Sequence, residues 1–168
     1  MLFEGRLLPR WLGGLMHSIA VPIVLAGVPW LVSLSAVRHG WTAGKPGAYN
    51  LLGLVPVWIG FCALAWCILV HFTAAPSGWR IEKTPHYPTP AYLLMKGPYR
   101  FSRNPIYLAE GAIWLGWIVF YGSVAVLTVL CLGAFFGPLI VRREERGLET
   151  RFGEMWRVYK RATPRWLV

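Results

Sequence analysis

A stretch of 15 residues, KGPYRFSRNPIYLAE (96–110), combines residue types that could bind an anionic ligand group. Its polar and ionisable members include Arg100, Arg103, Asn104, Tyr107 and Glu110. Pro105 suits the first turn of a helix and Asn104 suits the cap before it, so the N–H groups of that turn would face an anion. A basic, aromatic border that anchors a helix among lipid headgroups is the competing interpretation. The stretch by itself leaves both open.

Three glutamates are further candidates for chemistry. Glu144 and Glu145 directly follow an apolar segment, and they either form surface ion pairs along a helix or turn a carboxylate toward the 96–110 stretch. Glu110 lies inside an apolar segment, where an ionisable group is costly and usually has a partner. Arg103 or Arg100 is the natural partner. A structural ion pair and a catalytic role are both open for Glu110.

Several common types of site are absent from the sequence. All seven acidic residues are Glu, and the four histidines are scattered without an HExxH spacing. No GxGxxG, GxxxxGK[ST] or GxSxG motif occurs. The three cysteines, Cys62, Cys67 and Cys131, lie within apolar runs without ligand spacing and fit small core residues. We expect neither a metal site nor a disulfide framework.

The elements that must position these residues are apolar. Hydrophobic residues make up 56% of the chain and charged residues only 14%, against a charged fraction of roughly 25% in soluble domains. Lipid is therefore the expected solvent. The four apolar segments are Leu15–Val37, Leu51–Ala74, Ile106–Tyr121 and Ser123–Val141.

The lengths of these segments favour helices that cross a bilayer. The first runs for 23 uncharged residues, longer than the roughly 7–15 residues of a signal-peptide core. The third covers only about 24 Å at roughly 1.5 Å per residue, so we expect it to begin at the membrane surface. A tight turn at Tyr121-Gly122-Ser123 should join it to the fourth segment.

The distribution of cations predicts the orientation of the spans. The net charge is +10, but the basic residues lie between the apolar runs, which favours the positive-inside rule over a nucleic-acid-binding face. With four spans, 15 of the 17 cations fall on the side that holds both termini. We expect that side to be the cytoplasm, and the membrane to be a bacterial or archaeal inner membrane.

The tail after Val141 shows a helical pattern. Apolar residues recur at three- and four-residue spacing and predict one amphipathic stripe, formed by Leu148, Phe152, Met155, Trp156 and Tyr159. The predicted fold is thus an all-α, polytopic transmembrane bundle of about four spans with a cytosolic C-terminal amphipathic helix. It is one integrated membrane domain, in which residues 1–74 hold the N-terminal arm and two spans. Residues 75–168 hold the connector, the helical hairpin and the C-terminal helix.

Two spaced motifs resemble a known family. They are Gly97-Pro98-Tyr99-Arg100 with Arg103-Asn104-Pro105-x-Tyr107, and Glu144-Glu145-x-x-Leu148-x-x-x-Phe152-Gly153. They resemble the membrane methyltransferases related to isoprenylcysteine carboxyl methyltransferase and phospholipid N-methyltransferase. Trp156-x-x-Tyr159-Lys160 and Pro164-Arg165 continue the resemblance, which covers about residues 75–165.

The resemblance implies that S-adenosylmethionine is the methyl donor and S-adenosylhomocysteine the product, bound in a cytosol-facing site. The residues it assigns to the cofactor are Ala91, Tyr92, Leu93, Leu94, Tyr99, Asn104, Pro105, Ile106, Tyr107 and Glu144. Asn104 stands where prenylcysteine enzymes usually have His, and Ile140 where they have an Arg. The resemblance therefore carries over to the cofactor better than to the substrate.

The chemistry of the residues agrees with this assignment. Glu144 could hold the α-ammonium group of the cofactor, Arg103 its α-carboxylate, and Tyr99 and Tyr107 its adenine or sulfonium. A carboxylate or thiolate acceptor needs no general base, whereas an ammonium acceptor must first lose a proton. Glu110 or Glu145 could take it. The residues with candidate catalytic roles are Glu110, Glu145 and Arg103.

The expected function is methyl transfer to a lipophilic small molecule, a prenylcysteine-like carboxylate or a lipid headgroup within a bilayer. We expect no nucleic-acid partner and no metal. One alternative is a sterol-reductase-like membrane reductase, which would need more spans and a nicotinamide site. The other is a non-catalytic protein that binds anionic lipid through its basic faces.

Overall fold

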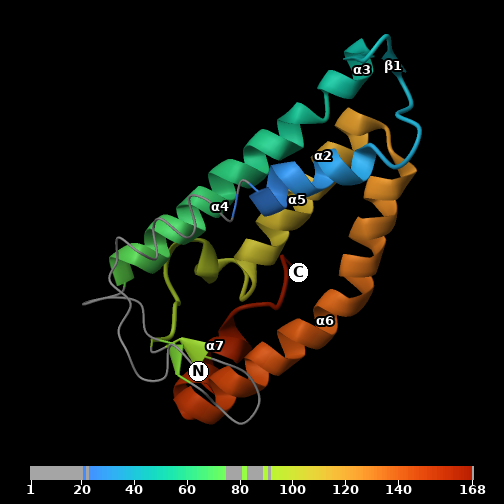
Figure 1. Cartoon of the computed structure of the whole chain (residues 1–168). Coiled ribbons are helices and arrows are strands. Elements are labelled where there is room, and N and C mark those ends of the chain that lie inside the picture. The colour runs from blue at the N-terminus through green and yellow to red at the C-terminus, as the bar shows by residue number, and fades with distance from the viewer. Residues whose placement is uncertain (1–20, 22, 75–80, 83–88, 91, 168) are drawn as a thin grey trace. The chain divides into compact units, whose positions relative to one another are not determined.

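The computed structural model describes residues 21, 23–74, 81–82, 89–90 and 92–167, and these residues are mostly helical (Figure 1). The chain forms two compact units. We call His17–Ala65 with Ile106–Phe135 the hairpin unit, and Met1–Met16, Trp66–Pro105 and Phe136–Val168 the tail unit. Each is described by itself.

The long helices coincide with three of the four predicted apolar segments. They are α4 (Leu54–Ala74), α5 (Pro105–Tyr121) and α6 (Val124–Phe152). Two helical stretches, Ala48–Ala74 and Val124–Phe152, are long and apolar enough to cross a membrane. Along α6, large side chains such as Leu132 and Leu139 are exposed, as expected of a helix whose surroundings are lipid. The prediction of four spans stays a prediction.

The first apolar segment is described only in part. Its described residues form a π-helical turn, η1 (Ile23–Gly27), followed by α2 (Val28–Ser33) with a proline in the first turn. Because Pro29 has no N–H, it cannot donate to the carbonyl oxygen of Leu25 one turn earlier, and Trp117 Nε1 donates to that oxygen. Residues 15–20 and 22 of the predicted Leu15–Val37 span lie outside the described residues, and residues 34–37 follow the end of α2.

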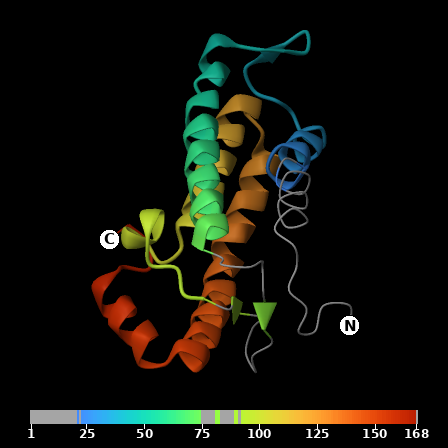
Figure 2. The ribbon, with the colours of Figure 1, turned by 90° about the vertical axis from the view of Figure 1, so that its left-hand side faces the viewer.

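Glycines allow α5 to lie directly against α4 in the hairpin unit. A Cβ atom on Gly116 would be 2.5 Å from the carbonyl oxygen of Gly53 and 2.7 Å from the backbone nitrogen of Val57. A Cβ atom on Gly60 would be 2.7 Å from the carbonyl oxygen of Ala109. Small residues that bring two backbones together are typical of helix packing in membranes. Figures 1 and 2 both show α5 running alongside α4.

A loop between α2 and α4 caps the end of α5. It contains strands β1 (Trp41–Thr42) and β2 (Lys45–Pro46) and the short helix α3 (Ala48–Leu51). The buried Asn50 donates from Nδ2 to the carbonyl oxygens of Val119 and Phe120, both at 3.0 Å. The last carbonyls of a helix lack helical donors, so the side-chain amide of Asn50 supplies the missing hydrogen-bond donors at the end of α5.

The predicted tight turn between the third and fourth segments is confirmed. Helix α5 ends at Tyr121 and α6 begins at Val124. Gly122 between them has a φ of 56°, and a Cβ atom there would collide with the carbonyl oxygen of His39. Glycine is required at this turn for its backbone conformation and for the close approach of the loop.

The tail unit holds the polar motif and the chain end. Its described elements, besides parts of α4 and α6, are β3 (Ile81–Glu82), β4 (Thr89–Pro90), the 3-10 helix η2 (Gly97–Arg100) and α7 (Glu154–Ala162). β3 and β4 form an antiparallel pair. The described residues between α4 and α5 are not continuously helical, in keeping with the prolines among them, such as Pro90 and Pro98.

The predicted single amphipathic stripe after Val141 needs correction. The helix of the fourth segment does continue into the tail, but it ends at Phe152, and α7 begins after Gly153. Gly153 has a φ of 53°, which breaks the helix and turns α7 back. Trp156 and Tyr159 are buried whereas Met155 is exposed. Figure 2 shows α7 reversing from the end of α6 toward η2.

We predict that Gly116→Ala destabilises the hairpin unit, because its Cβ has no room against α4. Overpacking of this kind costs about 1–3 kcal/mol of unfolding free energy. Gly111→Ala, on the same helix, is the matched control, because nothing lies within 4 Å of a Cβ atom at that position. Thermal unfolding in detergent measures both variants. Equal stability of the two would contradict the close packing of α4 and α5.

Candidate functional site

The polar motif begins on a short helix that packs on α4. Gly97 has a φ of 58°, and a Cβ atom there would be 2.7 Å from Cγ2 of Val70. Pro98 occupies the start of η2 and is buried. The left-handed glycine and the proline together turn the chain over the end of α4. This fixes where the following residues, 101–104, leave the helix.

Residues 102–104 are held by the end of the chain. The N–H of Arg103 donates to the carbonyl oxygen of Pro164 at 2.9 Å. Ser102 Oγ and Asn104 Nδ2 both donate to the carbonyl oxygen of Arg165, at 3.0 and 3.1 Å. Ser102 Oγ also accepts from the N–H of Asn104 at 3.0 Å. The predicted cap residue Asn104 does precede α5, and its side-chain amide is engaged by the tail.

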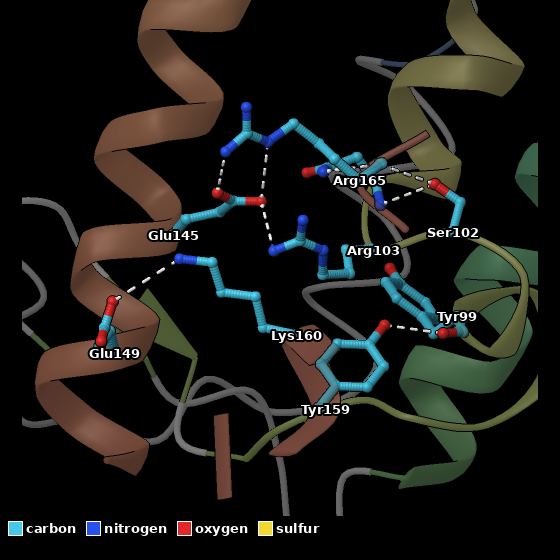
Figure 3. A network of polar contacts seen from close by, with 9 residues as sticks. Tyr99, Ser102, Arg103, Glu145, Glu149, Tyr159, Lys160 and Arg165 are labelled. Atoms are coloured by element: carbon cyan, nitrogen blue, oxygen red, sulfur yellow. Dashed lines mark hydrogen bonds and ion pairs between the residues drawn. The ribbon is translucent and has the colours of Figure 1, made fainter. Parts of the chain in front are cut away.

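Glu145 lies between two guanidinium groups (Figure 3). Arg165 donates to it from Nε at 3.1 Å and from Nη2 at 2.6 Å, one bond to each carboxylate oxygen. Nη1 of Arg103 lies 3.1 Å from Oε1 of the same carboxylate. Hydrogen bonding to Glu145 raises the pKa of Arg165 above its ordinary value. Glu145 is only 6% exposed, so its charge is compensated by these arginines rather than by water.

Arg103 keeps unused hydrogen-bond donors in this cluster. Its side chain is 9% exposed, and its Nε and Nη1 have no hydrogen-bond partner within the described part of the chain. The contact of Nη1 with Glu145 is thus an ion pair by distance without hydrogen-bond geometry. The carboxylate of Glu145 is thus shared by two guanidinium groups. An anionic group would suit the Nε–H donor of Arg103, which has no partner among the described residues.

Aromatic residues line the other side of the motif. The hydroxyl of Tyr159 donates to the carbonyl oxygen of Tyr99 at 2.7 Å. Burial raises the pKa of Tyr99, and the neighbouring groups Cys67, Tyr159, Tyr92 and Glu144 raise it further. Burial also raises the pKa of Tyr159 to about 12, against the opposing charge of Arg103. Both phenols are therefore neutral near pH 7.

The structure gathers most of the predicted site residues in the tail unit. These are Tyr92, Leu93, Leu94, Tyr99, Arg103, Asn104, Pro105, Glu144 and Glu145. Ile106, Tyr107 and Glu110 lie on α5 in the hairpin unit, and Ala91 lies outside the described residues. Arg103 forms an ion pair with Glu145. The predicted pairing of Glu110 with an arginine stays a prediction.

Three residues of the cluster, Ser102, Arg165 and Tyr159, are not among the site residues predicted from the sequence. Arg165 and Tyr159 belong to the motifs that continue the resemblance, and Tyr159 also to the predicted apolar stripe. Their roles depend on the reversal of the chain at Gly153, which brings residues about 60 positions apart into hydrogen-bond contact. In the sequence, only the presence of Pro164-Arg165 in the resemblance indicated that this segment contributes to the site. Within the described residues, no group of three or more metal-ligating side chains is close enough to hold a metal ion.

We predict that Glu145→Gln lowers the unfolding free energy by about 3 kcal/mol. The substitution leaves two guanidinium groups without their anion, and breaking a buried pair costs about 3–5 kcal/mol, with the lower end appropriate because Arg165 is partly exposed. Glu154→Gln is the control, since its pairs with Arg157 and Arg161 are on the surface. Thermal unfolding should separate the two variants. A Glu145→Gln protein as stable as the control would contradict a structural role for the cluster.

Comparison with known proteins identifies the family. The model of the phospholipid methyltransferase family matches residues 51–155, which include α5, the 96–110 stretch and the Glu144-Glu145 pair. No curated protein and no solved structure matches the chain significantly. The match covers more than half of the chain and confirms the family that the two motifs resemble. The chain belongs to the phospholipid methyltransferase family.

Proposed function

We propose that the protein transfers a methyl group from S-adenosylmethionine to a lipid or another lipophilic acceptor at a membrane surface. Family membership supports methyl transfer to lipid-type substrates. The use of S-adenosylmethionine is supported by one observation above all: residues of the two motifs lie close together in the tail unit. Arg103 contacts Glu145, and Tyr99 lies near enough to Glu144 for that charge to raise its pKa. These residues come from the two motifs to which the resemblance assigns the cofactor.

The groups present fit the charged ends of that cofactor. The unused donors of the buried Arg103 suit an α-carboxylate, and the carboxylate of Glu144 suits an α-ammonium group. Neutral Tyr99 offers an aromatic face and a hydroxyl without a competing charge. We propose that Asn104, Pro105, Ile106 and Tyr107, together with Tyr92, Leu93, Leu94 and Ala91, form the remainder of the binding site.

The protein's own part in the reaction is to bind, orient and exclude water. S-adenosylmethionine supplies, when bound, a methyl group on a sulfonium that is already an activated electrophile. Arg103 and Glu144 would fix the orientation of the amino-acid end, and this places the methyl group relative to an acceptor. No nucleophilic side chain is required of the enzyme.

A proton acceptor is needed only when the methyl acceptor is an amine. Glu110 and Glu145 are the two candidates from the sequence. Both oxygens of Glu145 are engaged by guanidinium groups, and proton transfer to it would disturb the cluster. We therefore propose Glu110 for this role and a structural one for Glu145.

The proposal includes the predicted topology. Four spans with both termini in the cytoplasm would put the tail unit's motif on the cytoplasmic side, where S-adenosylmethionine is available. The family match favours this function over a sterol-reductase-like enzyme. The alternative of a non-catalytic protein that binds anionic lipid predicts no nucleoside ligand at all.

We predict that the protein in lipid nanodiscs binds S-adenosylhomocysteine and that Glu144→Ala weakens this binding by about 10- to 100-fold. That range corresponds to the loss of one charge-assisted hydrogen bond, about 1.5–3 kcal/mol. Tyr107→Ala should also weaken binding, through the loss of an aromatic contact. Isothermal titration calorimetry measures each dissociation constant.

The control for this experiment is Glu154→Ala, which removes the same charge from an exposed position of the tail. Its dissociation constant should equal that of the unmutated protein. If the unmutated protein does not bind S-adenosylhomocysteine, the methyltransferase proposal is wrong. If Glu144→Ala binds normally, the role of Glu144 is wrong while the function stands.

A further inference from the structure

Three residues at the end of the chain, Thr163–Arg165, form what we call the strap. The strap leaves α7 at Thr163, whose N–H donates to the carbonyl oxygen of Tyr159 at 2.9 Å and whose backbone is extended. It then passes along residues 102–104 of the polar motif. Thr163 is buried. The proposed function assigns no binding or catalytic role to these three residues.

The strap attaches to the motif through its backbone. The carbonyl oxygen of Pro164 accepts from the N–H of Arg103, and that of Arg165 accepts from Ser102 and Asn104. Ser102 and Asn104 are buried, so these bonds are shielded from competing water. The N–H groups of Phe101 and Ser102 still donate to the carbonyl oxygen of Pro98 in η2. Arg103 and Asn104 lie beyond that turn and before α5, so the bonds to the strap order these two residues.

The side chain of Arg165 attaches the same strap to a different element. Its guanidinium donates to both oxygens of Glu145 on α6, at 3.1 and 2.6 Å. Arg165 therefore connects α6 to the motif through one residue: the side chain binds Glu145, and the carbonyl oxygen binds Ser102 and Asn104. Glu145 also pairs with Arg103. Removing the guanidinium would release the strap from α6 and leave Arg103 as the ion-pair partner of Glu145.

We propose that Arg165 is a positioning residue for the cofactor site. By docking the strap, it holds the backbone of Arg103 and Asn104 and keeps the Arg103 guanidinium from moving fully onto Glu145. This inference rests on the proposed function, because it assigns Arg103 and Asn104 to cofactor binding. Since the coupling of two binding events is reciprocal, a bound cofactor must strengthen the docking of the strap in turn.

The experiment compares three variants with the unmutated protein in lipid nanodiscs. Arg165→Ala removes the guanidinium, and Arg165→Lys keeps the charge without the two-bond geometry. Arg161→Ala is the matched control: it removes a tail arginine that is 67% exposed and paired with Glu154 on the surface. Calorimetry gives the dissociation constant for S-adenosylhomocysteine. Hydrogen exchange with and without the ligand reports on the N–H of Arg103, and thermal unfolding checks that each variant is folded.

The proposal expects Arg165→Ala to bind S-adenosylhomocysteine about tenfold more weakly, a typical size for coupling between sites. Arg165→Lys should lose less, and Arg161→Ala nothing. Ligand should slow exchange at the N–H of Arg103 in the unmutated protein, and much less in Arg165→Ala. A purely structural role would lower the unfolding temperature while leaving the dissociation constant of the folded protein and this ligand-dependent protection unchanged.

Two results would overturn the inference, and they differ. If the unmutated protein binds S-adenosylhomocysteine and both Arg165 variants bind it equally well, the inference is wrong and the proposed function stands. If the unmutated protein does not bind it, the proposed function fails and the inference with it. Should Arg165→Ala not fold, Arg165→Lys decides: weaker binding than in Arg161→Ala supports the inference, and equal binding overturns it.

Discussion

The buried carboxylate of Glu145 is the central contact of the polar residues in the tail unit. It contacts the guanidinium groups of Arg165, near the end of the chain, and of Arg103, in the motif after η2. Removing one partner from a buried ion pair is strongly destabilising, because the charge left behind is uncompensated. Arg165 of the strap and Arg103 of the motif both contact this carboxylate, so the cluster joins α6, the strap and the motif within the tail unit.

The two adjacent glutamates on α6, Glu144 and Glu145, have different surroundings. Both oxygens of Glu145 accept from a guanidinium group, and the charge of Glu144 is one of several that raise the pKa of Tyr99. Nε of Arg103, which has no hydrogen-bond partner among the described residues, is available to donate to an anion. The proposed binding of the cofactor would thus use residues beside the structural ion cluster.

The sequence predicted the helices well because their signals are local. The apolar run 51–74, the glycine turn at 122 and the start of a helix at Pro105 each lie within a few residues of the feature they predict. The two motifs likewise predicted the residues that meet in the tail unit. The roles of Ser102, Tyr159 and Arg165 could not be predicted, since they arise from contacts between distant residues. The division of the amphipathic stripe into two helices depends on the positive φ of Gly153. The apolar spacing continues across this glycine, so the pattern predicted one stripe where the structure has two helices.

A radiolabelled transfer assay is the most direct test of methyl transfer from S-adenosylmethionine to a lipid. The protein in liposomes made from a total lipid extract is supplied with S-adenosylmethionine labelled in its methyl group. If the protein methylates a lipid, the labelled methyl group will appear in the organic phase. Much less label should appear with Glu144→Ala than with the surface variant Glu154→Ala. Label that never exceeds that of protein-free liposomes, in a preparation that binds S-adenosylhomocysteine, would contradict a lipid acceptor.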